Sequence, residues 1–530
     1  MKRSYIFLIL LLGIFLRLWA FFHNYGINPD ATLYLYQTWA LAKGNFSLLK
    51  ICAISSRIKE INLFSVSIVP FFYIFKNLEI AGKCVSFIAS SLSLCFLYFI
   101  LKRYFKGLVL YLTLLIYAIH PILIKESSEI LRESLFSFYF LIGLWSFLKG
   151  LEVSNKWKGF YLMFSSITWI LSAWIRIEGL FFVIFSGIYL FGKLLFTSDK
   201  KEALKNLFWF LILPLIGFIL GLIYLSYFKG FIITEWLSKA KITNPFTQPY
   251  RKVLKTFEYK NIPAPSPYFW DMVRQNLWLI ALGTTLFYKF IPALYAPNLI
   301  FLLAGFKNLK NNLKKHQFLF YFLSFSIFYI IILWFFAFTH WYMEKRYMLP
   351  LIYLLSPFLG LGIENLINWF KEKFSNLSYQ KIVTIVCLYI VIFSLPKSMA
   401  SIRKRKLGIK KIGVEIAKYL PKNIENVCET TRCESLIFTS KCEIIFFAGN
   451  AKGFMMCPKF INSKFYYWLS QRPEKFIKYI KNKNYKFVVL EERYLKRNLN
   501  IVKEKLIKEG YKFLKEEKII SGKLVLLGKI

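Results

Sequence analysis

The chain has 530 residues, of which 57% are hydrophobic and 20% aromatic, and its mean hydropathy is +0.48. A soluble protein of this length carries more charge and fewer aromatic residues, so the composition excludes an ordinary soluble enzyme. The formal net charge of +43 does not indicate nucleic-acid binding. Many lysines and arginines stand at the ends of apolar segments, where the positive-inside rule places them in membrane proteins.

The first apolar segment covers residues 5–22, directly after Lys2 and Arg3. It is long enough to cross a bilayer, and it lacks a small-residue cleavage site. We therefore expect an uncleaved membrane anchor with a cytoplasmic N-terminus. Further apolar segments bring the predicted total to about eleven spans, at residues 80–101, 108–124, 135–148, 161–175, 180–196, 207–228, 291–306, 318–338, 349–370 and 382–395.

The basic loops between these segments all fall on the cytoplasmic side in this topology, and an odd number of spans places the C-terminal end outside. We expect a multi-pass protein of the plasma (inner) membrane, with a transmembrane domain over residues 1–400 and an extracytoplasmic α/β domain over 401–530. The second domain alternates predicted helices and strands. The helices are expected at 410–419, 474–483 and 501–510, and the strands at 442–447, 487–490 and 524–527.

The eight cysteines fall into two groups. Four lie in or near the spans and are interpreted as small apolar fillers: Cys52, Cys84, Cys95 and Cys387. The other four cluster in the C-terminal domain, where an extracytoplasmic location would allow one or two disulfides, although free thiols remain an alternative. They are Cys428, Cys433, Cys442 and Cys457, and their spacings do not match a close zinc-binding pair.

Ionisable groups at the external ends of the spans are the candidate functional residues, because charge near membrane depth is costly. Asp occurs only three times in the chain. Asp30 follows the first span and either caps a short helix or supplies a reactive carboxylate. Asp271 lies in a long proline-rich external segment, where a plain loop charge is favoured over a role in a lid, and Asp199 reads as a solvated loop charge.

Three further clusters lie at the same predicted face. Glu126, Glu129 and Glu133 precede the fourth span, and the last two share one side if the segment is helical. A solvated helix start would also explain them. Arg176 and Glu178 stand between two spans, where they either neutralise each other or bind a ligand. Arg346 either snorkels to the interface or binds an anion. Convergence on one face favours a site over separate structural accidents.

These residues together resemble the GT-C superfamily of membrane glycosyltransferases, and most closely the family 39 branch akin to protein O-mannosyltransferases and aminoarabinose transferases of lipid A. The likeness is carried by short motifs along most of the chain: Arg17-Leu18, Asp30, Ser128-Glu129 through Glu133-Ser134-Leu135, Arg176 to Gly179, Arg346-Tyr347 with Pro350, and residues 445–449. It implies a polytopic α-helical membrane protein of about eleven spans with a small C-terminal α/β soluble domain.

The resemblance also implies a function. A polyprenyl-phosphate-linked donor would supply a hexosyl or pentosyl group to a lipid, glycan or protein acceptor at the external face, with inversion. Asp30 would take the acceptor proton. Arg346, with Lys345, and Arg176 would stabilise the departing phosphate. Glu133 with Glu129, and Glu178 with Tyr347, complete the predicted substrate-binding set.

The predicted partners are the lipid-linked donor, the acceptor and membrane lipids, with no nucleic acid. No cofactor is required by these residues, although a divalent metal ion held by Asp30 and Glu133 stays open. The main alternative function is a transporter or flippase of lipid-linked saccharides, which would place ionisable groups nearer the bilayer midplane. A surface-polysaccharide ligase or polymerase is a further alternative, and a non-catalytic scaffold leaves the polar clusters unexplained.

Overall fold

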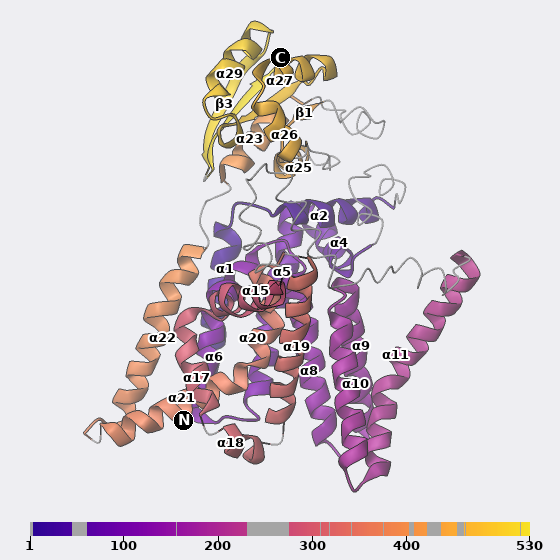
Figure 1. Cartoon of the computed structure of the whole chain (residues 1–530), viewed down its shortest axis with the longest axis vertical. Helices are drawn as coiled ribbons and strands as arrows, with labels where there is room; N and C mark the ends of the chain where they lie inside the picture. The colour runs from indigo at the N-terminus through magenta and orange to yellow at the C-terminus, as the bar shows by residue number, and fades with distance from the viewer. Residues whose placement is uncertain are drawn as a thin grey trace. The chain divides into compact units, whose positions relative to one another are not determined.

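The computed structural model describes residues 4–44, 61–154, 156–229, 275–307, 309–316, 318–340, 342–374, 376–401, 407–420, 436–452, 461, 463–519 and 521–529. Within this part of the chain the architecture is helical up to Ser401, and a four-stranded sheet with helices follows (Figure 1). The predicted fold class, a polytopic helical membrane protein with a small C-terminal α/β portion, is confirmed.

Over the described residues, fewer helices have the length and hydropathy of a membrane span than the eleven predicted. Seven described helical segments are long and apolar enough to cross a membrane. These are α1 (Ser4–His23), α5 (Leu78–Leu101), α8 (Glu133–Glu152), α10 (Gly179–Phe196), residues Leu277–Leu294, α19 (Leu319–His340) and α22 (Tyr379–Ser401). The count rises to nine if two bent pairs each make one span. The predicted spans at 161–175 and 207–228 lie in α9 (Trp157–Ile175) and α11 (Lys200–Lys229), which fall outside this count.

Proline explains both bent pairs. Helix α6 (Gly107–Ala118) meets α7 (Pro121–Ser128) at 47°. The turn η4 (Lys345–Met348) with α20 (Leu349–Leu354) meets α21 (Ser356–Lys373) at 62°. Pro121 begins α7 and Pro357 stands in the first turn of α21, so each lies just after a bend, where the missing N–H is tolerated. Each predicted single span is therefore two helices at an angle.

One predicted boundary is wrong. The external proline-rich segment was expected to extend from Gly230 to about Lys289, yet its last part joins a continuous apolar run over residues 277–294. This run consists of α15 (Leu277–Gly283), the π-helix η2 (Thr284–Phe290) and α16 (Ile291–Leu294). The predicted span at 291–306 is instead broken at Tyr295, whose φ is +70°, and by Pro297. A short 3-10 turn η3 (Ala296–Asn298) and α17 (Leu299–Phe306) follow the break.

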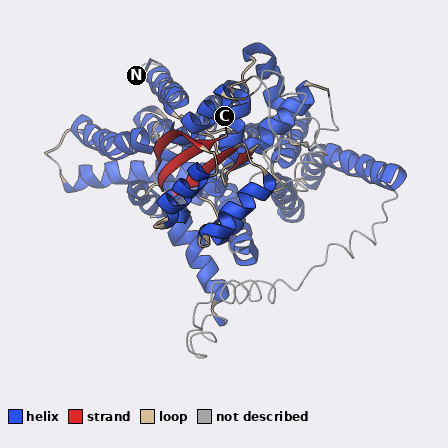
Figure 2. Cartoon of the chain, turned by 90° about the horizontal axis from the view of Figure 1, so that it is seen from above, coloured by secondary structure: helices blue, strands red, loops and turns tan. Residues whose placement is uncertain are grey.

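The C-terminal sheet has strand order β1-β2-β4-β3 (red in Figure 2). Strand β1 (Ile437–Phe438) runs parallel to β2 (Phe487–Glu491), while β4 (Gly522–Gly528) pairs antiparallel with β2 and with β3 (Lys512–Ile519). Helices α26 (Ser463–Ser470), α27 (Pro473–Lys483), α28 (Glu492–Leu495) and α29 (Asn498–Lys508) accompany the strands. The buried core includes Phe438, Tyr466, Phe476, Val488 and Leu506.

The predicted helices of this region are confirmed as α23 (Leu407–Lys418), α27 and α29, and two of the strands as β2 and β4. The expected strand at 442–447 is wrong, because these residues form helix α25 (Cys442–Asn450). A short continuous apolar run fits a buried helix as well as a buried strand. Strand β3 was missed because its sequence, KFLKEEKI, is charged and half exposed.

Contacts divide the chain into two compact units. The first comprises residues Met1–Ile14, Ser91–Leu123 and Phe136–Ser398, and the second comprises Phe15–Ser90, Ile124–Leu135 and Met399–Ile530. The second unit thus joins the C-terminal region with the segment that follows the first span. The division into domains at residue 400, and the orientation in the membrane, remain predictions.

Candidate functional site

Asp30 occupies the first turn of α2 (Pro29–Ala42), in the second unit. Asn28, not Asp30, is the N-cap: its side-chain oxygen accepts a hydrogen bond from the Asp30 backbone N–H at 3.2 Å. Pro29 holds the first helical position with its fixed φ. The capping role that would have given Asp30 a purely structural use is therefore filled by another residue, and the Asp30 side chain is exposed.

Helix α25 of the C-terminal region contacts the start of α2 within the same unit. The Cys442 thiol lies 3.9 Å from the carbonyl oxygen of Pro29, the residue before Asp30. Burial raises the pKa of the Cys442 thiol to about 12, so the thiol is neutral at physiological pH. Cys442 is free, and Cys428, Cys433 and Cys457 lie outside the described residues.

A buried charge network in the second unit was missed by the sequence analysis. Glu79, at the start of α5, accepts from Lys83 at 2.8 Å and from Lys410 of α23 at 2.7 Å. The Lys83 ammonium also donates to the Asn24 carbonyl at 2.6 Å. The side chains of Glu79 and Lys83 are only 7% and 8% exposed. Opposite charges four residues apart at the edge of an apolar segment are the sequence signal that could have revealed this pair.

Glu129 and Glu133 do not share one helical face. Helix α7 ends at Ser128 and α8 begins at Glu133, so the helical spacing assumed for Glu129 and Glu133 is wrong. Glu129 instead pairs with Lys125 at 3.3 Å. Glu133 is buried in the first turn of α8, where the helix dipole stabilises a carboxylate.

The cationic residues predicted for phosphate binding belong to the first unit. Arg176 ends α9 in an extended conformation, and its guanidinium forms an ion pair with Glu178 at 2.5 Å. The turn that follows needs glycine at position 179, because a Cβ there would lie only 2.3 Å from the Ala173 backbone nitrogen. A tight turn between α9 and α10 therefore fixes Arg176 and Glu178 at one end of the two helices.

Arg176 and Arg346, 170 positions apart in the sequence, meet at Tyr347. The Arg176 guanidinium lies 4.3 Å from the centre of the Tyr347 ring, and that of Arg346 lies 5.9 Å from it. The Tyr329 hydroxyl donates to the Tyr347 carbonyl at 3.2 Å, which fixes the backbone of the η4 turn. Cation–π contacts of this kind orient guanidinium groups without neutralising their charge. Lys345 adjoins them and is exposed.

We name Arg176, Glu178, Lys345, Arg346 and Tyr347 the arginine cluster. All five were predicted as substrate-binding residues, and the structure brings Arg176, Glu178, Arg346 and Tyr347 into direct contact. The acidic candidates Asp30, Glu129 and Glu133 belong to the other unit. Asp271 lies outside the described residues.

Among the described residues, no group of three His, Cys, Asp or Glu side chains gathers in one place. Mg²⁺ is usually held by only one or two carboxylates together with substrate phosphates. A divalent metal held by Asp30 and Glu133 therefore stays a prediction.

Comparison with known proteins identifies the fold. No family model matches the sequence, and no curated protein matches it. The chain nevertheless has the fold of the GT-C membrane glycosyltransferases, confirming the fold expected from the resemblance.

Two solved GT-C proteins show this likeness. ArnT from Cupriavidus metallidurans, solved bound to undecaprenyl phosphate, superposes with a TM-score of 0.57 at 11% identity, covering 100% of this chain and 99% of ArnT. The archaeal oligosaccharyltransferase AglB from Archaeoglobus fulgidus, in complex with an inhibitory peptide and a dolichol-phosphate, gives 0.56 at 13% identity, covering 98% of this chain and 74% of AglB. At these identities the likeness establishes the fold.

Proposed function

We propose that the protein is a glycosyltransferase that moves a sugar from a polyprenyl-phosphate-linked donor to an acceptor at the external face of the membrane. The observation that carries the proposal is the meeting of Arg176 and Arg346 at Tyr347 within a GT-C fold. Both solved GT-C proteins are in complex with a lipid phosphate, undecaprenyl phosphate in one and a dolichol-phosphate in the other. A phosphate is the chemical group that such a cluster would recognise.

The arginine cluster suits a phosphate leaving group. Its cations, Arg176, Lys345 and Arg346, outnumber the neighbouring acids Glu178 and Glu344. A lipid phosphate gains negative charge as the bond from its oxygen to the anomeric carbon breaks, so preorganised guanidinium donors stabilise the transition state more than the ground state. A phosphate is also a good leaving group, so this side of the reaction needs cations more than a proton donor.

Asp30 is proposed as the base on the acceptor side. The acceptor hydroxyl oxygen would attack the anomeric carbon, the carbon–phosphate-oxygen bond would break, and the hydroxyl proton would pass to the Asp30 carboxylate. The result is one new glycosidic bond, a free lipid phosphate and inversion at the anomeric carbon. Support comes from the exposure of Asp30 in the first turn of α2, a helix that Asn28 caps. Glu133 and Glu129 are proposed to orient the sugar or the acceptor.

The test distinguishes the effect of losing the Asp30 carboxylate from the effect of disturbing the start of α2. Purified protein in detergent is supplied with synthetic polyprenyl-phosphate sugars and a membrane lipid extract, and glycosylated product is measured. Asp30→Asn is expected to lower kcat by about 10²–10⁴, the usual contribution of a general base, with donor binding unchanged. Asn28→Ala is the matched control, because it removes the cap, at about 1 kcal/mol, while keeping the carboxylate. Full activity in Asp30→Asn would refute the role of Asp30.

The same assay separates a transferase from the alternative of a transporter. A transferase forms product in micelles, where no compartment exists, whereas a flippase changes only the location of a lipid-linked sugar in sealed vesicles. Product formed in detergent that disappears in Arg346→Ala supports transfer. Movement of the donor across vesicles without any product would favour transport and would contradict the proposal.

A further inference from the structure

A pocket lined by charged residues lies at the opposite end of α9 from Arg176. It is formed where α9 begins and α11 begins, and it has a volume of about 940 Å³. Helix α9 has 19 residues, which at about 1.5 Å per residue separates its two ends by roughly 28 Å, close to the thickness of a bilayer core. The pocket is thus far from the arginine cluster and takes no part in the proposed transfer.

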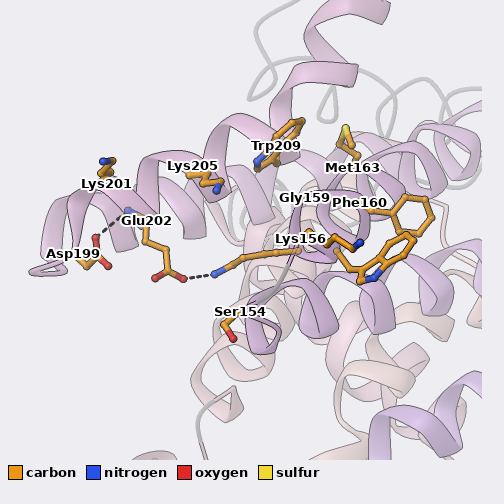
Figure 3. A pocket seen from close by; sticks show the side chains of 12 residues that line it. Ser154, Lys156, Gly159, Phe160, Met163, Asp199, Lys201, Glu202, Lys205 and Trp209 are labelled. Carbon is orange, nitrogen blue, oxygen red and sulfur yellow. Dashed lines mark hydrogen bonds and ion pairs between the residues drawn. The ribbon is translucent and has the colours of Figure 1, made fainter.

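Four lysines line this pocket: Lys156, Lys158, Lys201 and Lys205 (Figure 3). Lys158 pairs with Glu202, and the Glu202 backbone N–H is itself held by the Asp199 side chain at 3.0 Å. The two acids of the pocket are therefore used locally, one in an ion pair and the other at the start of α11. Among the described residues, Lys156, Lys201 and Lys205 form no ion pair, so their charge is available to a ligand.

Three aromatic residues also line the pocket: Trp157, Phe160 and Trp209. The Trp209 ring lies directly against the backbone of α9 at Gly159, where an added Cβ would sit 2.9 Å from a ring carbon. Trp157 and Phe160 are 53% and 49% exposed and lie in edge-to-face contact with each other. Exposed tryptophan beside lysine is the composition of a membrane–water interface, where the ring meets the acyl boundary and the ammonium reaches water.

The neighbouring surface decides between a lipid and a soluble anion. On α11, Leu204 and Phe208 next to the lysines are 57% and 54% exposed. Such a surface is stable against acyl chains and unfavourable against water. A ligand that satisfies both the lysines and this apolar surface carries a phosphate and a hydrocarbon chain together.

We propose that this pocket binds the phosphate headgroup of an anionic phospholipid of the membrane. The unpaired lysines contact the phosphate, Trp157 and Trp209 pack on the glycerol and upper acyl region, and the chains follow the exposed face of α11. Basic pockets between membrane helices commonly bind anionic headgroups in this way. The site anchors the α9–α11 end of the first unit to one leaflet.

The test measures lipid binding and needs no activity. Purified protein is titrated with phosphatidylglycerol, phosphatidylcholine or inorganic phosphate, and retained lipid is counted by native mass spectrometry. Wild-type protein is expected to retain phosphatidylglycerol at least about tenfold more tightly than phosphatidylcholine, because each basic residue adds attraction to an anionic headgroup. The triple variant Lys156→Gln/Lys201→Gln/Lys205→Gln is expected to lose that preference, and added salt is expected to weaken it.

The matched control is Lys310→Gln/Lys314→Gln/Lys315→Gln on α18 (Leu309–Lys315), which removes the same charge from exposed lysines outside the pocket. It should keep the preference for phosphatidylglycerol, and all variants should unfold at the same temperature. Equal loss in both triple variants would show that binding reflects net charge alone and would overturn the proposal. Displacement of the lipid by low-millimolar inorganic phosphate would assign the pocket to a soluble anion and would overturn it equally.

Discussion

The ion pair of Arg176 and Glu178 allows the structural and functional roles of Arg176 to be separated. Their side chains are 5% and 16% exposed, and their nitrogen and oxygen atoms are 2.5 Å apart. Arg176→Met would leave a mostly buried carboxylate without its cation, for which the expected cost is about 3 kcal/mol, the lower end for a broken buried pair because Glu178 keeps some solvent. Removing both charges in Arg176→Met/Glu178→Met should restore stability to within about 1 kcal/mol, since neither charge is then left alone.

The control is an equally short pair on the surface. Lys481 and Glu509 also approach to 2.5 Å, yet their side chains are 50% and 34% exposed. Lys481→Met should therefore cost at most about 1 kcal/mol. Stability is measured by unfolding in mixed detergent micelles containing increasing dodecyl sulfate, followed by tryptophan fluorescence.

Donor binding gives the second readout for the same variants. The stability of the double variant should return, while its affinity for a polyprenyl-phosphate sugar should stay reduced by about 10-fold to 150-fold, the worth of a charge-assisted hydrogen bond to phosphate. A double variant that binds the donor normally would show that Arg176 serves only to neutralise Glu178. A double variant as unstable as Arg176→Met would show that the burial argument is wrong.

Three further outcomes are expected. Tyr347→Phe should keep the affinity for the donor, while Tyr347→Leu should lower it several-fold, because only an aromatic face orients the Arg176 guanidinium. Donor titration measures both affinities, and equal affinities would contradict this role. Glu79→Gln should destabilise the protein by about 3 kcal/mol, because Lys83 would stay buried without the Glu79 carboxylate. The same micelle unfolding assay measures this, and an unchanged midpoint of unfolding would refute it. The pKa of the Cys442 thiol is raised from 9.0 to about 12, and the thiolate is the nucleophile. At pH 8, Cys442 should therefore react with a maleimide about a thousand-fold more slowly than an ordinary cysteine. Mass spectrometry of the alkylated peptide measures this rate, and a fast reaction would contradict the prediction.

Bends at proline and the secondary structure of short apolar runs could not be predicted from the sequence. Eleven apolar segments were visible, yet new helices begin at Pro121 and beside Pro357, so two expected spans are bent pairs. Hydropathy records how apolar a segment is, and it does not record where the backbone turns. The run at 442–447 had the same ambiguity, and packing against α2 and α23 made it a helix.

The sequence by itself determined that this is a helical membrane protein, and it indicated most of the candidate residues. Hydropathy required membrane helices, and the short motifs indicated a GT-C fold, because both depend on residue type and order along the chain. Tertiary structure decided which candidates meet. Arg176 contacts Tyr347, 171 positions later, and Lys410 contacts Glu79, 331 positions earlier, and no local pattern encodes such pairs. Long-range contacts arise when helices pack, so only the folded chain could show that Arg176 and Arg346 meet at Tyr347. It also showed that Glu129 pairs with Lys125 instead.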